Sequence, residues 1–259
     1  TMLRKSFLNQ KFIQNFSLFP AYTVAGCIRQ ICLLFFITLL TVLSFGNPLE
    51  PVEPNQIIPL PRQYSILSSS AVDVGASWKI VADQNNDKDW FSAKYLKDEI
   101  MEVSDSNLNL EIVDFSQLPS QKRIIIGNPQ DPNISSIVSS YGIDISIDLQ
   151  NDKHNQGYVL LADPNGILII SDTTTGNFYG VISLNWLLKY DSDNESIVLK
   201  NTKITDWPDL EVRGFYGPYY FKFHGQDINT RDDPEEWIEI MAKYKYNLYC
   251  GVETAPLPN

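Results

Sequence analysis

The sequence has few of the residues on which disulfide cores and metal centres depend. It contains three cysteines and two histidines among 259 residues. Cys27 and Cys32 stand in or beside an apolar run near the N-terminus, so Cys250 is alone in the remainder and an internal disulfide is excluded there. No group of cysteines and histidines has metal-site spacing. We therefore expect neither a metal site nor a disulfide framework.

Familiar catalytic and cofactor motifs are also absent. The sequence has no glycine-rich phosphate loop, no Ser-x-x-Lys and no Gly-x-Ser-x-Gly element. Two acidic pairs, Asp232-Asp233 and Glu235-Glu236, surround a predicted helix start, where negative charge interacts favourably with the helix dipole. His154 and His224 are predicted to be solvated loop residues. We expect no cofactor and no catalytic residue in this chain.

Positive charge is scarce outside the N-terminus. The first 49 residues hold four basic and no acidic residues, so sixteen basic and 31 acidic residues remain in the rest of the chain. The sixteen form no run or stripe. Binding to a phosphate backbone requires clustered Lys and Arg, and a nucleic-acid partner is therefore not expected.

The long apolar run at residues 31–46 is uncharged and follows those four basic residues. It predicts a signal peptide or an uncleaved signal-anchor over residues 1–46, with a buried helix as a further alternative. Both targeting interpretations place the body outside the cytoplasm, secreted or membrane-anchored, with membrane contact only through this segment. Five prolines between 47 and 62 predict an extended linker over residues 47–64.

The chain as a whole has the composition of a globular protein, with 44% hydrophobic and 12% aromatic residues. A helix is predicted at 89–103, with Asp89 as its N-cap, and another at 177–189. Asn165-Gly166 predicts a positive φ in a hairpin turn. We predict strands at residues 78–81, 108–115, 123–127, 157–162, 167–171, 197–199 and 203–204. Residues 65–205 thus predict one α+β domain, a mixed or antiparallel sheet covered by helices on one face.

A second unit begins at Trp207-Pro208. Strands are predicted at 210–217 and 247–251, with a helix between them that starts at Pro234 and ends near Tyr244. A (β/α)8 barrel needs about 250 residues. We therefore expect residues 206–259 to be the first βαβ unit of an incomplete TIM barrel, cut off after the second strand.

In their order and spacing, these segments resemble the β-N-acetylhexosaminidases of glycoside hydrolase families 20 and 84 between residues 65 and 251. The resemblance covers their N-terminal α+β domain and its junction with the catalytic barrel. It rests on Gly176–Gly180 (GNFYG), Asp206-Trp207-Pro208, Arg213-Gly214 and Met241–Asn247 (MAKYKYN). Bacterial α-glucuronidases carry a related domain, so the N-terminal part of an α-glucuronidase-like hydrolase is an alternative.

The resemblance implies a sugar-binding site in the first barrel strand. In family 20 the arginine of Arg-Gly binds hydroxyls of the terminal N-acetylhexosamine, which makes Arg213, with Gly214 and Gly217 beside it, the expected substrate-binding set. In family 84 a similar strand reads Gly-Phe-Tyr-Gly, here residues 214–217. The alternative is that Arg213 pairs with a nearby carboxylate such as Asp209 or Glu211.

Catalysis in these families uses two carboxylates at the end of the fourth barrel strand, together with the acetamido group of the substrate. Only two strands are expected here, so the catalytic pair lies outside this chain. We predict the non-catalytic N-terminal portion of an exported β-N-acetylhexosaminidase-like glycoside hydrolase, inactive by itself. Its partner, given a full barrel, is an N-acetylhexosamine-containing glycan. A stand-alone surface module that binds glycan or protein is the alternative.

Overall fold

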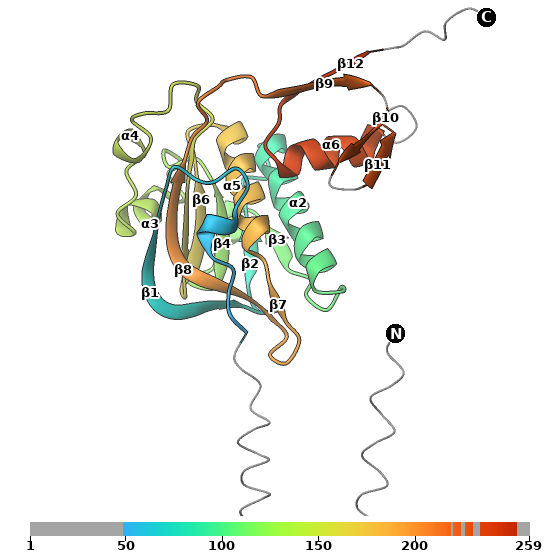
Figure 1. Ribbon diagram of the computed structural model, residues 1–259. Helices are drawn as coiled ribbons and strands as arrows, with labels where there is room; N and C mark the ends of the chain where they lie inside the picture. Colours follow the sequence, from blue (N-terminus) through green and yellow to red (C-terminus); the bar gives the residue numbers. More distant parts are fainter. Residues whose placement is uncertain (1–48, 219, 224–225, 230–233, 253–259) are drawn as a thin grey trace, which may run out of the picture. The chain divides into compact units, whose positions relative to one another are not determined.

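The fold is that of a computed structural model, which describes residues 49–218, 220–223, 226–229 and 234–252. All of them lie in the compact part of the chain that begins at Leu49, which holds both the α+β domain and the β-α-β segment after it (Figure 1). The helices are α2 (Asp87–Val103), α3 (Ser135–Ser140), α4 (Ile145–Asp148), α5 (Thr174–Leu187) and α6 (Pro234–Lys243), with short 3-10 turns η1 (Pro54–Gln56) and η2 (Phe115–Gln117). Within these described residues, no helix is long and apolar enough to cross a membrane.

The main sheet is mixed, as predicted, and its strands run in the order β1-β8-β5-β6-β4-β2-β3, with β7 paired to β8. The strands β2, β3, β4 and β6 are mutually parallel, while β5, β8 and β1 pair antiparallel. The bounds are β1 (Gln63–Val74), β2 (Lys79–Val81), β3 (Glu111–Val113), β4 (Arg123–Gly127), β5 (Tyr158–Asp163), β6 (Gly166–Ile170), β7 (Tyr190–Asp191) and β8 (Ser196–Asp206).

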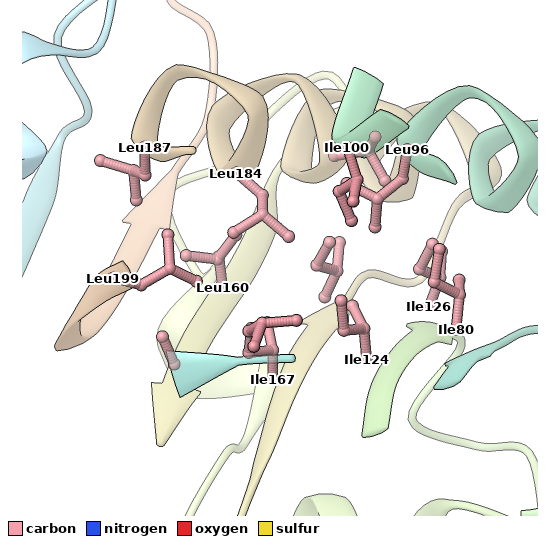
Figure 2. Packing of buried hydrophobic residues seen from close by; sticks show 14 of the residues in the cluster. Ile80, Leu96, Ile100, Ile124, Ile126, Leu160, Ile167, Leu184, Leu187 and Leu199 are labelled. Atoms are coloured by element: carbon pink, nitrogen blue, oxygen red, sulfur yellow. The ribbon is translucent and has the colours of Figure 1, made fainter. Parts of the chain in front are cut away.

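Both faces of the sheet are covered. The long helices α2 and α5 pack on one face, where Leu96 and Leu184 meet Ile124 and Leu160 from the strands (Figure 2). The short helices α3 and α4, which the sequence did not predict, cover the other face through residues such as Val138. This double cover explains why β4 and β6 are apolar at nearly every position.

The local signals at two turns differ from those predicted. Asn86 caps α2 by accepting hydrogen bonds from the backbone N–H groups of residues 88 and 89, and Asp89 lies inside the helix. The β5–β6 hairpin is present, but its two turn residues are Pro164 and Asn165, and neither Asn165 nor Gly166 has a positive φ. Gly166 is instead the first residue of β6 and pairs with Asp163.

The proline-rich segment is packed onto the sheet where it is described. Ile57 is 1% exposed, and Val52 forms a β-bridge with Leu199 of β8. The next residues form β1, an unpredicted strand that pairs along β8 with an irregularity between Ile66 and Ala71. Residues 49–64 therefore contribute to the domain's packing rather than forming an extended linker. The predicted targeting segment, residues 1–46, lies outside the described residues.

The second unit contains the predicted strand, helix and strand. Strands β9 (Gly214–Pro218) and β12 (Leu248–Val252) pair in parallel, and α6 lies between them in the chain. A small antiparallel hairpin, β10 (Tyr220–Phe223) and β11 (Gln226–Asn229), precedes α6. His224, Asp232 and Asp233 lie outside the described residues.

Candidate functional site at the junction of the two units

The residues that carried the functional prediction lie where the α+β domain meets β9 and β12. We call this region the junction and define it as residues 207–213, which link β8 to β9, together with residues 244–247, which link α6 to β12. Near it, α6 packs on the domain's helices: the Trp186 indole N–H donates to the Lys243 carbonyl oxygen (2.9 Å), and the Trp186 and Tyr244 rings meet edge to face.

A buried polar cluster forms the centre of the junction. The Lys245 ammonium lies 2.8 Å from the Asp206 carboxylate, at the end of β8, and 2.9 Å from the Tyr158 hydroxyl of β5. Tyr158 also hydrogen-bonds to Asp206 (3.1 Å) and to the Ser183 hydroxyl of α5. Lys245, Tyr158 and Asp206 are 5%, 1% and 9% exposed, so these bonds are made away from water.

Burial sets the electrostatics of this cluster. It lowers the pKa of the Lys245 ammonium, while the adjacent Asp206 carboxylate opposes that shift. Burial and the Asp206 charge raise the pKa of Tyr158 well above its usual value, so its hydroxyl keeps its proton at neutral pH. The ammonium, hydroxyl and carboxylate groups are hydrogen-bonded to one another. The arrangement is that of a structural ion pair.

Arg213, the last residue of the link between β8 and β9, is held by protein groups. Its Nε donates to the Lys245 carbonyl oxygen (2.9 Å), and its Nη1 donates to Gln156 Oε1 (2.9 Å) and to the Leu210 carbonyl oxygen (2.7 Å). The guanidinium also stands 5.0 Å from the centre of the Tyr179 ring, at a distance typical of a cation–π contact.

The position of Arg213 bears on the predicted sugar contact. Arg213 precedes β9 and is therefore at the N-terminal end of that strand, whereas the sites of barrel enzymes lie at the C-terminal ends. The alternative carboxylate partners are not used either: Asp209 pairs with Arg62, and Glu211 contributes its carbonyl oxygen to Asn247. The geometry favours a positioning role for Arg213, and a sugar contact for it stays a prediction.

The two predicted glycines have different surroundings. A Cβ on Gly214 would lie 3.0 Å from the Leu248 Cβ, so glycine allows β9 and β12 to approach closely at this pair. Gly217 is paired with Gly251 in the same ladder. These backbone positions describe strand packing, and their predicted role in substrate binding stays a prediction.

Sequence reasoning missed the parts played by Lys245 and Asn247. Asn247 accepts a hydrogen bond from the Arg213 backbone N–H (2.8 Å) and returns one to the Arg213 carbonyl oxygen (2.8 Å). The available signal was the pair of polar residues directly after an amphipathic helix. His154, predicted to be solvated, is half-buried, with its Nε2 3.1 Å from the Asp209 carbonyl oxygen.

Two hollows flank the junction. One, of about 640 Å³, lies between the first turns of α2 and α5 and helix α6, and Phe91, Phe178 and Met241 are among the residues that line it. The other, of about 330 Å³, is lined by Trp207, Tyr179 and the charged groups of the junction. Among the described residues, no group of three His, Cys, Asp or Glu side chains could hold a metal ion.

Fold and junction together define a class, the α+β domain that precedes the catalytic barrel of a glycoside hydrolase. The family model described as "Glycosyl hydrolase family 20, domain 2" matches residues 55–207, which is more than half of the chain. The chain therefore belongs to the glycosyl hydrolase family 20 domain 2 family. The predicted resemblance to this domain is confirmed.

The individual relatives are consistent with this assignment. A β-hexosaminidase of Porphyromonas gingivalis is 28% identical over 198 residues, covering 74% of this chain and 22% of the relative. A Streptomyces plicatus β-hexosaminidase structure, a D313A mutant with GlcNAc, superposes with a TM-score of 0.56 at 18% identity, covering 79% of this chain and 35% of that one. The structure of CpGH84D gives 0.57 at 18% identity, covering 81% and 31%.

The coverage limits what these relatives say. The two structural likenesses show the fold, and the chain spans 22% of the P. gingivalis β-hexosaminidase and 31–35% of the two structures.

Proposed function

We propose that this chain is the N-terminal, non-catalytic portion of an exported β-N-acetylhexosaminidase-like glycoside hydrolase. One observation carries the proposal: the family 20 domain 2 match ends at residue 207, and the chain continues there into the parallel pair β9–β12 with α6 between them. A strand–helix–strand unit with parallel strands is the repeating unit of a (β/α)8 barrel. The family match favours this reading over an α-glucuronidase.

In this proposal the α+β domain supports the start of the barrel. Strand β8 pairs with both β1 and β5 and ends at Asp206, which holds Lys245 next to β12. Two acids at or beside the junction are engaged in ion pairs: Asp206 with Lys245, and Asp209 with Arg62. The catalytic carboxylates would be supplied by later strands, where the N-acetylhexosamine of the glycan would bind.

The catalytic part of the proposal is tested by comparing two proteins. The purified 259-residue chain should not hydrolyse a chromogenic N-acetylglucosaminide. A protein extended to the end of the natural reading frame should hydrolyse it under the same conditions. Turnover by the 259-residue chain, or none by an extended protein that folds, would contradict the proposal.

Export is tested separately. Residues 1–46 are fused to a phosphatase that gains activity only outside the cytoplasm, and a matched fusion lacks residues 31–46. The complete fusion should be active in intact cells, and the deleted one should not. Equal activity of the two fusions would show that the apolar run does not direct export.

A further inference from the structure

Lys245 has a backbone conformation that is unusual for a residue with a side chain. Its φ is +57°, in the left-handed region. It follows α6 in a Schellman motif, with the Lys245 N–H bonded to the Ala242 carbonyl oxygen (2.9 Å) and the Tyr246 N–H to the Met241 carbonyl oxygen (2.9 Å). Glycine is the usual residue at this position because it has no Cβ to clash.

Two other helices of the chain end in the same motif: α2 has Asp105 at this place, with φ +50° and the N–H groups of residues 105 and 106 bonded to the carbonyl oxygens of Glu102 and Met101, and α3 has glycine. Helix α3 ends in a Schellman motif with Gly142 at φ +66°, where the N–H groups of residues 142 and 143 bond to the carbonyl oxygens of Ser139 and Val138. A lysine at 245 therefore carries a steric cost that glycine at 142 does not. Asp105 is exposed, whereas Lys245 combines this backbone conformation with a buried side chain, and that combination points to a role for the side chain.

The contacts of Lys245 show what its side chain and backbone hold together. Its ammonium reaches Asp206 and Tyr158 in two strands of the domain sheet, and its carbonyl oxygen accepts from Arg213, directly before β9. Two residues later, Asn247 bonds to the backbone of Arg213. A neighbouring lysine behaves differently, since the Lys243 side chain is 41% exposed and its ammonium is 3.7 Å from Glu99.

We propose that Lys245 is a positioning residue that fixes the start of β12, and through Arg213 and Asn247 the start of β9, on the sheet of the α+β domain. Its left-handed backbone directs the side chain into the buried cluster, and the ion pair with Asp206 holds it there. The anchoring is a property of this chain. Its consequence, a set orientation for the first two strands of a catalytic barrel, rests on the proposed function.

The test measures amide hydrogen exchange, segment by segment, in the 259-residue chain. The variants are Lys245→Met, which removes the ammonium, and Lys245→Gly, which removes it and also relieves the backbone. Lys243→Met is the matched control. Both Lys245 variants should speed exchange in residues 214–218 and 248–252 by at least about tenfold, with β4 and β6 unchanged, because an unanchored segment opens locally. Lys243→Met should match the wild type.

Lys245→Gly is the decisive variant. Exchange equal to or slower than the wild type in that variant would show that the lysine side chain positions nothing, and faster exchange spread equally over β4 and β6 would show general destabilisation. Either result overturns the proposal. No sugar substrate is involved, so a failure here is distinct from a failure of the hexosaminidase assignment.

A substitution on the other side of the ion pair tests the same proposal if a Lys245 variant does not fold. Asp206→Asn preserves shape and leaves the ammonium without its counter-charge, so it should give the same local increase in exchange. The double variant Asp206→Asn with Lys245→Met should exchange no faster than either single variant, because the effects of two substitutions in one ion pair are not additive. Unchanged exchange in Asp206→Asn, or additive effects in the double variant, would overturn the proposal.

Discussion

At the scale of single residues, two glycines of α5 stand where a larger residue does not fit. A Cβ on Gly176 would collide with the Gly157 carbonyl oxygen and with Ser171. A Cβ on Gly180 would collide with the side chain of Ile169 on β6. Close approach of helix to sheet, rather than backbone flexibility, is therefore what these glycines provide.

We predict that Gly176→Ala destabilises the fold by about 2 kcal/mol, because overpacking a core typically costs about 1–3 kcal/mol. Alanine gains up to about 1 kcal/mol as a helix former, and the collision with fixed backbone outweighs that gain. The measurement is the midpoint of urea unfolding.

Gly75→Ala is the control for that substitution. A Cβ there has nothing within 4 Å, so the change should stay within about 0.5 kcal/mol. If Gly176→Ala proved as stable as the wild type, the close approach of α5 to the strand ends would be wrong.

At the scale of elements, α5 depends on its first turn. The Thr173 hydroxyl accepts from the Gly176 N–H (3.1 Å) and donates to the Asn155 carbonyl oxygen (2.8 Å), so it caps the helix and fastens the loop before β5. Much of the buried core lies beneath this helix (Figure 2).

We predict that Thr173→Ala lowers the free energy of unfolding by about 1–2 kcal/mol, in the upper part of the range for lost N-caps because two hydrogen bonds disappear. Thr175→Ala, at an exposed position of the same turn, should change it by less than about 0.5 kcal/mol. Thermal unfolding followed by circular dichroism measures both, and equal effects of the two substitutions would contradict the capping role.

Elements with dense apolar runs could be predicted from the sequence, and those held by polar contacts could not. The runs at β4, β5 and β6 fixed both the existence and the type of these strands. Strand β8 was predicted as two short pieces because polar residues interrupt it. The structure shows why it is continuous: Asn201 bonds to Ser68, and Thr202 bonds to the Ser65 carbonyl oxygen, both on β1.

The junction was predictable in place but not in chemistry. The order of motifs predicted a boundary between Asp206 and Arg213, and in the structure β8 ends at Asp206 and β9 begins at Gly214. Its bonds could not be foreseen, because Arg213 is held largely by carbonyl oxygens, which every residue possesses and which no sequence pattern marks. The role of Lys245 depends on a left-handed backbone that only the structure reveals.

At the scale of the whole molecule, acidity is the dominant electrostatic feature, with a formal net charge of −11. Several exposed aspartates organise turns. Hydrogen bonds lower the pKa of Asp144 (from Ser146), Asp191 (from Asn194) and Asp114 (first the backbone N–H of Ser116). Each pKa is lower in the folded chain than in the unfolded one. Between the two pKa values, the folded state therefore binds fewer protons than the unfolded state.

We predict that stability falls as the pH drops below about 4, since the unfolded aspartates then take up protons first. The contribution of these three side chains is complete above their unfolded pKa and is lost as the pH passes through the lowered folded values. Urea unfolding between pH 2 and 5 measures it. The triple variant Asp114→Asn, Asp144→Asn and Asp191→Asn should show a shallower loss, and an unchanged slope would show that other groups govern acid unfolding.

The link between the two units is short and open at its middle. Only residues 207–213 join β8 to β9, and residues 209–212 are exposed. A protease cut between Leu210 and Glu211 would leave Asp206 on one fragment and Lys245 on the other, still joined by their hydrogen bonds. In the uncut chain the link keeps the two parts at a high effective concentration, while the noncovalent contacts set their orientation. We expect the two fragments to stay associated after such a cut, because the Lys245–Asp206 and Arg213–Gln156 hydrogen bonds cross it.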